Sequence, residues 1–283
     1  MSKNQSLVLF ARIHKQSSGA VVGTMVGLAI VLGGPAFAAG VNRRIDSEVP
    51  TAVKKTGSLR VATNGGLNSD LARALADLMG LKLKRVSPPF VKVLPGVVAH
   101  RYDLGMASIT DTRAREKIVD FVTYFRTGIS LYERAGGGPI ITVLSDLCGH
   151  RVGVPQGTIE ETEATAQSST CIAAGKPAVM LVSFADEGTA TNALLSGDVE
   201  VAMADTPIAT GYVKSSNGHL MLAGQPFDVQ PYGIAVAKHR GLAKPVLDAL
   251  RVLVSNGKYS AILKKWGLGS GAIAHPKING AIG

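Results

Sequence analysis

Residues 58–86 read SLRVATNGGLNSDLARALADLMGLKLKRV and carry three periodic patterns in succession. Ser58–Thr63 is typical of a short strand, and a polar cluster follows it. Leucine and methionine then recur every three or four residues across Leu71–Met79, as in a helix that Gly80 ends. Leu81–Val86 has the alternation of a second strand. A strand, a helix and a strand in this order predict an α/β fold with a largely parallel sheet.

The alternation of strands and helices continues along the chain, with a glycine-rich break at Arg134–Pro139. Before the break, the pattern predicts a helix over residues 93–100 and a strand over 102–107. The elements predicted after the break are strands over 151–154, 178–184, 199–204 and 233–237, and helices over 158–174, 190–195, from 206 onward, 245–254 and 259–266. Residues 54–127 and 148–222 are thus similar blocks, which predicts two lobes with a crevice between them. In such sheets, ligands bind beyond the carboxyl ends of the strands.

Composition narrows the class of protein. The 283 residues are 46% hydrophobic and include two cysteines. This composition excludes a disordered chain and a disulfide-dense miniprotein, and the presence of only one long apolar run excludes a multispanning membrane protein. The formal net charge is +10, but the basic residues are scattered and form no stripe interleaved with aromatic residues. We therefore expect no nucleic-acid partner.

The first 38 residues have the pattern of a secretory signal peptide. Three basic residues and no acidic one precede the uncharged run Ala20–Leu32, and the segment ends in Ala36–Ala38. We expect cleavage after Ala38, which removes three of the ten net charges and leaves +7, and we expect a periplasmic location. The alternative is an uncleaved membrane anchor, because the apolar run can extend to about 20 residues.

Cys148 and Cys171 are the two cysteines of the chain and lie 23 residues apart. Both belong to the part that follows the predicted signal peptide, and an oxidising compartment lets them form a disulfide bond. Two unpaired buried thiols are the alternative.

Several kinds of catalytic and cofactor site are absent from the sequence. The six histidines are isolated, Gly136–Gly138 lacks the lysine and hydroxyl residue of a phosphate loop, and Gly65–Gly66 falls short of a dinucleotide fingerprint. No serine stands in a Gly-x-Ser-x-Gly elbow. We therefore expect no metal and no cofactor; an enzyme stays an open alternative, although the sequence shows no obvious nucleophile.

Polar turns follow three of the predicted strands, at Ser108–Phe121, Pro155–Glu161 and Asp205–Pro207. Each joins a strand to a helix and offers backbone N–H groups and hydroxyls that suit an anion. Arg113 in the first turn supplies a guanidinium fork that can hold a carboxylate with two hydrogen bonds. Asp205 in the third turn supplies an acceptor for an ammonium group. Together these groups suit a zwitterionic amino acid.

Each of these residues also has a structural alternative. Thr158 and Glu161 match a capping box, and Asp205, followed by threonine and proline, matches a helix N-cap. Arg113 can be a solvated surface residue. Capping residues and ligand-binding residues can coincide, so both interpretations stay open.

Seven motifs occur together in one order along the chain. They are Leu59–Thr63, Tyr102–Arg113, Val119–Phe121, Asp146–Thr158, Ala204–Pro207, Pro231–Val236 and Gly257–Gly267. With these motifs the chain resembles the family 3 periplasmic solute-binding proteins of ABC importers, especially the binders of polar amino acids, over about residues 54–268. The stretch from Cys148 to Cys171 also resembles members that carry a disulfide in the second lobe.

The resemblance implies the two-lobed fold of periplasmic binding proteins (venus flytrap, type II), in which each lobe is a mostly parallel sheet flanked by helices. Residues 39–132 and 228–283 are expected in the first lobe, and residues 133–227 in the second. The chain is expected to cross between the lobes near Glu133–Pro139 and Ala223–Phe227, which would form the hinge.

In the first lobe, the resemblance assigns four ligand contacts. Arg113 is expected to hold the α-carboxylate of the ligand, Ser108 to supply a hydroxyl contact and Met106 a backbone contact. Phe90 is expected to line the pocket for the ligand side chain.

In the second lobe, the resemblance assigns contacts from two turns. Thr158, in a Gln-Gly-Thr turn, is expected to contact the carboxylate. Asp205 is expected to receive the α-amino group, so that the two lobes hold opposite ends of the zwitterion.

The loop after the first strand departs from the family pattern. Residues 64–70 form a loop shorter by over a dozen residues, without the aromatic side chain that stacks on the ligand in family members. Asn64 stands where an acidic residue often lies. This departure bears directly on which ligand is bound.

The predicted function is that of an extracytoplasmic binding protein. It captures an amino acid or an amino-acid-like small molecule between two lobes and delivers it to an ABC permease in the inner membrane, and the protein is expected to be a monomer. One alternative is an enzyme like the periplasmic cyclohexadienyl dehydratases, for which Asp205 and Glu160 are the candidate general acids. The other is a degenerate sensor that binds no ligand.

Overall fold

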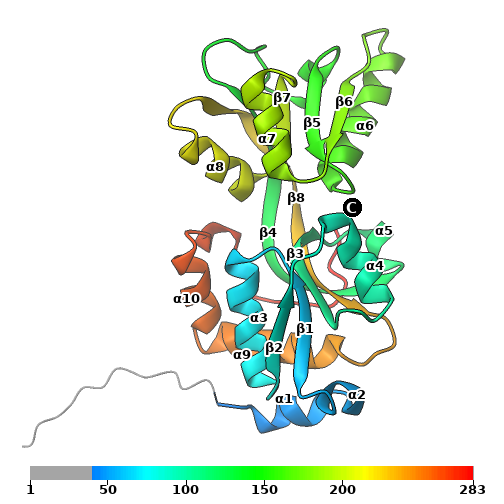
Figure 1. Cartoon of the computed structure of the whole chain (residues 1–283), viewed down its shortest axis with the longest axis vertical. Coiled ribbons are helices and arrows are strands. Elements are labelled where there is room, and N and C mark those ends of the chain that lie inside the picture. The colour runs from blue at the N-terminus through cyan, green and yellow to red at the C-terminus, as the bar shows by residue number, and fades with distance from the viewer. Residues whose placement is uncertain (1–39, 283) are drawn as a thin grey trace, which may run out of the picture. The chain divides into compact units, whose positions relative to one another are not determined.

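The computed structural model describes residues 40–282, so the predicted signal peptide of residues 1–38 lies outside the described part. Within this part the strands are β1 (Ser58–Thr63), β2 (Lys82–Val86), β3 (Leu104–Thr110), β4 (Val119–Arg134), β5 (Arg151–Pro155), β6 (Met180–Phe184), β7 (Val201–Asp205) and β8 (Leu220–Ala237). They form one sheet in the order β2-β1-β3-β8-β4-β7-β5-β6 (Figure 1). Pairs within β1–β3 and within β5–β7 are parallel, whereas pairs that include β4 or β8 are antiparallel. We call the block of β1–β3 the first lobe and the block of β5–β7 the second lobe.

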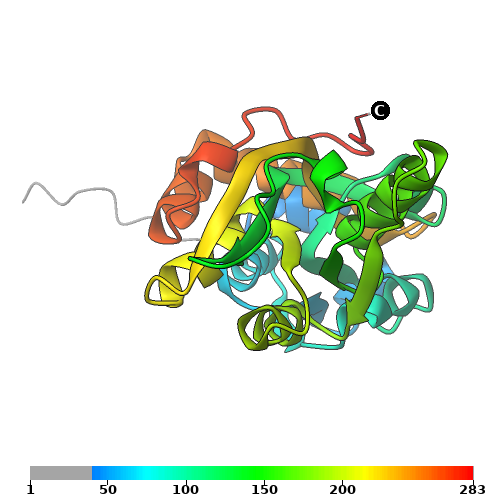
Figure 2. The same cartoon turned by 90° about the horizontal axis from the view of Figure 1, so that it is seen from above.

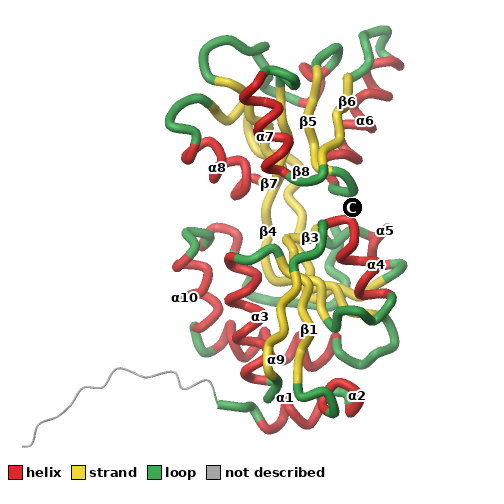
Figure 3. Tube along the Cα trace, in the orientation of Figure 1, coloured by secondary structure: helices red, strands yellow, loops and turns green. Residues whose placement is uncertain are grey.

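Helices flank the strands in both lobes (Figure 3). The α-helices are α1 (Arg43–Glu48), α2 (Thr51–Lys54), α3 (Gly66–Leu78), α4 (Val93–Val98), α5 (Arg113–Glu116), α6 (Ile159–Ala173), α7 (Glu187–Ser196), α8 (Thr206–Ser215), α9 (Ala243–Ser255) and α10 (Lys258–Lys265). The 3-10 turns are η1 (Phe90–Lys92), η2 (Leu144–Leu147) and η3 (Gly269–Gly271). None of the helices within residues 40–282 combines the length and the apolar character needed to cross a membrane.

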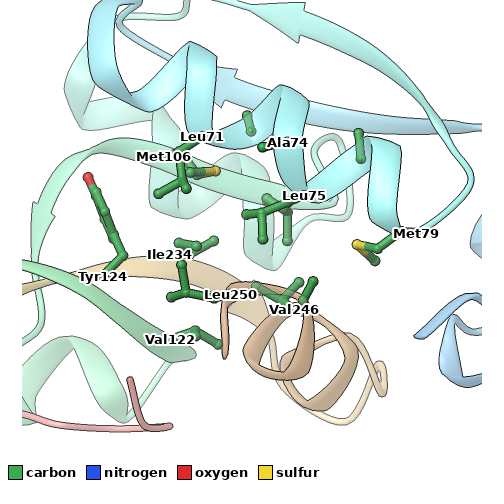
Figure 4. Packing of buried hydrophobic residues seen from close by; sticks show 14 of the residues in the cluster. Leu71, Ala74, Leu75, Met79, Met106, Val122, Tyr124, Ile234, Val246 and Leu250 are labelled. Carbon is green, nitrogen blue, oxygen red and sulfur yellow. The ribbon is translucent and has the colours of Figure 1, made fainter. Parts of the chain in front are cut away.

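The core of the first lobe explains why α3 and α9 form where they do. Leu71, Leu75 and Met79 follow one another at four-residue intervals along α3 and its C-cap, and all three are buried. Val246 and Leu250 have the same spacing on α9, and Figure 4 shows the two helices facing each other through these side chains. Apolar residues at this spacing lie on one face of a helix. Burying each leucine contributes about 1.5–3 kcal/mol to the free energy of folding.

β4 and β8 run through both lobes and pair with each other over most of their length (Figure 1). On β4, Phe125 packs in the core of the first lobe and Ile129 in that of the second. On β8, Phe227 packs against the second core and Tyr232 lies in the first. Gly128 lies on β4 between Phe125 and Ile129, where the strand passes from one core to the other. A Cβ atom on Gly128 would come within 2.6 Å of the Phe227 carbonyl oxygen. The two strands thus pass from one core to the other side by side and in close contact.

Two strands differ from the sequence-based prediction. β4 is not predicted by the pattern, and β8 is predicted only over residues 233–237 although it begins at Leu220. The residues of β4 are almost continuously buried, so the period-two alternation that marks a half-buried strand is missing. β4 leaves the core of the first lobe after Phe125 and enters that of the second lobe at Ile129. This passage comes earlier in the chain than the crossing expected at Glu133–Pro139.

Cys148 and Cys171 form a disulfide bond, which confirms the pairing over the alternative of two free thiols. The bond joins the end of η2 to α6 in the second lobe, and Cys171 packs in the core of that lobe.

Replacing both cysteines by serine is expected to lower the free energy of unfolding by about 3 kcal/mol, because the bond closes a loop in the unfolded chain. The sequence separation that sets this loop is 23 residues. Urea unfolding measures the change, and the parent protein treated with a reductant should unfold at the same midpoint as the variant. Equal midpoints for the variant and the oxidised parent would contradict a stabilising role.

Candidate functional site

A pocket with a volume of about 600 Å³ is lined by both lobes. Its walls come from the carboxyl ends of the parallel strands β1–β3 and β5–β7 and the turns after them, where ligands bind in α/β sheets. Small-molecule sites have volumes of roughly 300–1,000 Å³, so this pocket has the size of a ligand site. The charged side chains that line it are Arg115, Glu160, Asp186, Glu187 and Asp205. One guanidinium therefore faces four carboxyl groups.

Arg115 is the positive group of this pocket, and α5 carries it there. Its guanidinium donates one hydrogen bond to the Thr110 carbonyl oxygen (2.9 Å) and one to the Gly157 carbonyl oxygen of the second lobe (3.0 Å). It also lies 5.9 Å from the centre of the Phe90 ring. Burial lowers the pKa of Arg115, but a guanidinium stays charged at neutral pH. With five N–H donors, it keeps further donors for a carboxylate.

Arg113, the residue predicted to hold a carboxylate, lies on the same helical turn but outside the residues that line the pocket. It is exposed, whereas Arg115 is half-buried. Successive residues of an α-helix are rotated by about 100°, so side chains two positions apart point to nearly opposite sides. Only one of the two arginines can face the pocket, and the structure brings Arg115 there.

Asp205 lies at the N-cap position of α8, yet its side chain makes no capping hydrogen bond. It lines the pocket together with Glu160, which lies in the first turn of α6. The two residues are 9% and 3% exposed. Burial raises the pKa of both carboxyl groups, and repulsion by Glu160 adds to the shift of Asp205 against a hydrogen bond from the Tyr232 hydroxyl. A positively charged ligand group placed beside them would therefore stabilise the ionised form of both carboxyl groups.

Glu187 begins α7 directly after β6, and the Tyr132 hydroxyl donates to its Oε1 atom (2.7 Å). Burial, with repulsion by Glu160 and Asp186, raises the pKa of Glu187 to about 8. Asp186 behaves differently, because its carboxylate caps α7 by accepting from the Thr189 N–H (2.8 Å), which lowers its pKa. The pocket thus holds three carboxyl groups with raised pKa values and one arginine.

Ser108 and Met106 lie in an irregular stretch of β3. Between Gly105 and Ile109 the pairing with β8 shifts register, and such a bulge re-aims side chains and frees backbone groups. Ser108 lines the pocket with a φ of 55°, which is uncommon for a residue other than glycine. The Met106 side chain is buried in the core of the first lobe (Figure 4), so only its backbone is available for the predicted contact.

Thr158 and Phe90 both line the pocket, from opposite lobes. The Thr158 hydroxyl caps α6 by accepting from the Glu161 N–H (3.3 Å), and it donates to the Pro155 carbonyl oxygen (2.7 Å). The Glu161 carboxylate accepts from the N–H of Gly157 (2.8 Å), one residue earlier than in a regular capping box. Capping and lining the pocket therefore coincide at Thr158.

The short loop after β1 brings Asn64 to the pocket. The Asn68 amide donates to Asn64 Oδ1 (2.7 Å) and to Ser108 Oγ (3.1 Å), and it accepts from the Tyr124 hydroxyl. This polar network fixes one rim of the pocket to the core. The aromatic residues of the lining are Phe90 and Tyr212.

Arg115, Asp186 and Glu187 are the charged pocket residues that sequence reasoning did not assign. Glu187 follows a predicted strand, so applying the rule of post-strand turns to β6 would have found it. The side chains of Arg113 and Arg115 point in nearly opposite directions from α5. The sequence alone does not show which of these two directions leads into the pocket. Within residues 40–282, no group of three or more His, Cys, Asp or Glu side chains is arranged to hold a metal ion.

Comparison with known proteins gives a match to the family described as bacterial extracellular solute-binding proteins, family 3, over residues 49–269. The arginine-binding protein ArgT of Corynebacterium glutamicum is 27% identical, over 83% of this chain and 82% of ArgT. The ABC transporter glutamine-binding protein GlnH of Bacillus subtilis is 31% identical, over 71% of this chain and 72% of GlnH. Both relatives are named as binding proteins, in agreement with the prediction of a binding protein rather than an enzyme.

Among solved structures, an ancestral arginine-binding protein bound to arginine matches with a TM-score of 0.68 and 31% sequence identity. The match covers 74% of this chain and 98% of that protein. It confirms the predicted two-lobed α/β fold of the periplasmic binding proteins.

Proposed function

The chain belongs to family 3 of the bacterial extracellular solute-binding proteins, and we propose that it binds a free amino acid with a positively charged side chain. The observation that carries the proposal is the charge pattern of the pocket. Arg115 faces the same space as Glu160, Glu187 and Asp205, the three carboxyl groups with raised pKa values. A cationic amino acid has one negative and two positive groups. Its charges are therefore opposite in sign to those of the pocket groups.

Each charged group of the ligand has a proposed partner. Arg115 holds the α-carboxylate, in the role that the sequence motif suggests for Arg113. Asp205 receives the α-ammonium group, and Glu187 receives the cationic side chain. Charge-assisted hydrogen bonds of this kind are about twice as strong as neutral ones. The relatives named as arginine-binding support the assignment of a cationic ligand.

We further propose that the two lobes close around the ligand by bending of β4 and β8, where both strands pass between the two cores. The protein acts in the periplasm as a monomer, after cleavage behind Ala38, and delivers its ligand to an ABC permease in the inner membrane. Membership of an extracellular family and the transporter named for GlnH support this role.

Calorimetry of the purified mature protein with L-arginine, L-lysine, L-glutamine and L-cystine at pH 8 tests the proposed ligand class. Arginine or lysine is expected to bind at least about tenfold more tightly than glutamine, because a hydrogen bond to a charged group contributes about 1.5–3 kcal/mol. The preferred ligand at 100 times its Kd should also stabilise the protein by about 2.7 kcal/mol in thermal unfolding.

Tight binding of glutamine without binding of arginine or lysine would contradict a cationic ligand while keeping an amino-acid binder. Absence of stabilisation by every amino acid would favour the degenerate sensor. Formation of an aromatic product from prephenate or arogenate would favour the enzyme.

A further inference from the structure

The chain continues after η3 as a tail, residues 272–282, that lies beyond the part of the chain that matches the family. Figure 2 shows it as the red segment that leads to the end marked C. The tail runs along β4: the Thr123 N–H donates to the Lys277 carbonyl oxygen (3.0 Å), and the Asn279 N–H donates to the Phe121 carbonyl oxygen (2.9 Å). An isolated antiparallel bridge lies between these two hydrogen bonds. The tail is therefore docked on the first lobe.

At its end, the tail reaches the segment that carries Arg115. The N–H of Gly280 donates to Asp111 Oδ2 (2.7 Å), and the N–H of Ala281 donates to Glu116 Oε1 (3.1 Å). Asp111 precedes α5, and Glu116 is its last residue. Two consecutive N–H groups thus hold both ends of α5, and Figure 1 shows the C-terminal end next to this helix.

The two carboxyl groups that receive these hydrogen bonds lie close enough to affect each other. Asp111 is fully buried, and the Glu116 carboxyl group helps to raise its pKa. Asp111 Oδ1 has no hydrogen-bond partner among the described residues, and a proton shared with Glu116 would satisfy it. Burial raises the pKa of Asp111 to about 7, with the Gly280 N–H and the Lys277 charge acting in the opposite direction.

α5 depends on such outside contacts for its orientation. It is a single turn, Arg113–Glu116, and so short a helix is not stable on its own. On the pocket side, the Arg115 guanidinium donates to the carbonyl oxygens of Thr110 and Gly157. At the two ends of the turn, the tail holds the carboxyl groups of Asp111 and Glu116. The direction of the guanidinium therefore depends on both sets of contacts.

We propose that the tail is a positioning element for Arg115: Gly280 and Ala281 hold Asp111 and Glu116, and thereby fix the guanidinium where it meets the carboxylate of the ligand. This inference rests on the proposed function and extends it to a part of the chain outside the family match. The tail and the two carboxyl groups act through Arg115 and do not touch the ligand.

The test compares Asp111→Ala and Ala281→Pro with the parent protein by calorimetry. The probes are L-arginine and agmatine, which is arginine without its carboxylate. Both variants are expected to weaken arginine binding about tenfold and to leave agmatine binding unchanged, because only arginine presents the group that Arg115 holds. In an Arg115→Gln background, neither substitution should weaken arginine binding further.

Two control variants and one measurement without ligand complete the design. Asp111→Asn keeps an acceptor for Gly280 and supplies a donor for Glu116, so it is expected to bind arginine like the parent. His275→Ala changes an exposed side chain of the tail and should also match the parent. In the ligand-free protein, amide hydrogen exchange across residues 112–118 is expected to be faster in Asp111→Ala and Ala281→Pro.

Unchanged exchange in both variants would overturn the inference, and so would an unchanged Kd for arginine. The inference would also be overturned if both variants weakened binding of arginine and agmatine equally and weakened arginine binding further in the Arg115→Gln background. Such a result would show a general loss of structure. A parent that binds neither probe would count against the proposed function, while the exchange measurement would still decide whether the tail holds α5.

Discussion

Arg115→Gln is expected to raise the Kd for L-arginine by about a hundredfold or more, whereas Arg113→Gln should change it by less than about threefold. Removing one partner of a buried, hydrogen-bonded charge pair costs about 2–5 kcal/mol, much of it from the charge left unpaired on the other side. Here the unpaired charge would be the α-carboxylate of the ligand. Arg115 lines the pocket and donates to carbonyl oxygens on both sides of it, while Arg113 lies exposed on the same turn.

The two variants are a matched pair, since each makes the same replacement on α5, removing one positive charge and leaving an uncharged polar side chain. Calorimetry at pH 8 gives the two Kd values, and urea unfolding checks that both variants fold. Loss of binding in Arg113→Gln together with normal binding in Arg115→Gln would contradict the geometry and favour the arginine assigned by the sequence motif.

Glu187→Gln is expected to weaken arginine binding about tenfold at pH 9 and to leave glutamine binding unchanged, because it removes the carboxylate proposed for the cationic side chain. Glutamine at this position can still accept the hydrogen bond of the Tyr132 hydroxyl, so the local structure is kept. Calorimetry with arginine and glutamine as probes measures both effects. Equal losses for the two probes would contradict a role for the charge.

The same variant is expected to lose the part of the pH dependence of arginine binding that comes from Glu187, while Asp205 keeps its own contribution. In the ligand-free protein, burial raises the pKa of Glu187 to about 8, and a cation binds the ionised form. The affinity of the parent for arginine should therefore rise between about pH 6 and pH 9 and level off above the raised pKa, by up to about tenfold per pH unit for one linked proton. Measurements in buffers of different ionisation enthalpy should also detect a proton released on binding.

The stability of the ligand-free protein should show the opposite trend. The unfolded chain releases the Glu187 proton near the ordinary pKa of glutamate, whereas the folded chain keeps it up to about pH 8. Between these values the folded state binds more protons, so this group lowers stability as pH rises, and Glu187→Gln should remove that fall. Asp186→Asn is the matched variant: it removes a charge that helps to raise the pKa of Glu187, so it should move both slopes to lower pH without abolishing them. A parent whose arginine affinity is constant from pH 6 to pH 9 would contradict the assignment.

The elements that the sequence predicts well are those with a regular burial pattern. β1 has the predicted bounds, Ser58–Thr63, and α3 follows from leucines that recur on one face. β4 was missed because a strand that packs into two cores in succession is buried along both faces and shows no alternation. The tail has no periodic pattern either, because its docking depends on backbone hydrogen bonds to single residues of β4 and the α5 segment.

At the site, the general rule about strand ends agrees with the residues that line the pocket, whereas the ligand contact of Arg113 stays a prediction. Polar residues after parallel strands were expected to meet, and Ser108, Thr158 and Asp205 do line one pocket. The motif placed the ligand arginine at position 113, but the choice between two arginines on one helical turn depends on how that turn is anchored. Its anchors include Gly280, far away in the sequence, which no local pattern could reveal.

The close pairing of β4 and β8 limits how the lobes can move. Two strands joined by hydrogen bonds resist sliding past each other but can bend and twist together, so closure of the kind proposed above would follow mainly this bending. Ligands with different side chains would then close the lobes to a similar outer geometry. A transporter that recognises this geometry can accept cargo without reading the chemistry of the ligand, which leaves selectivity to the pocket alone.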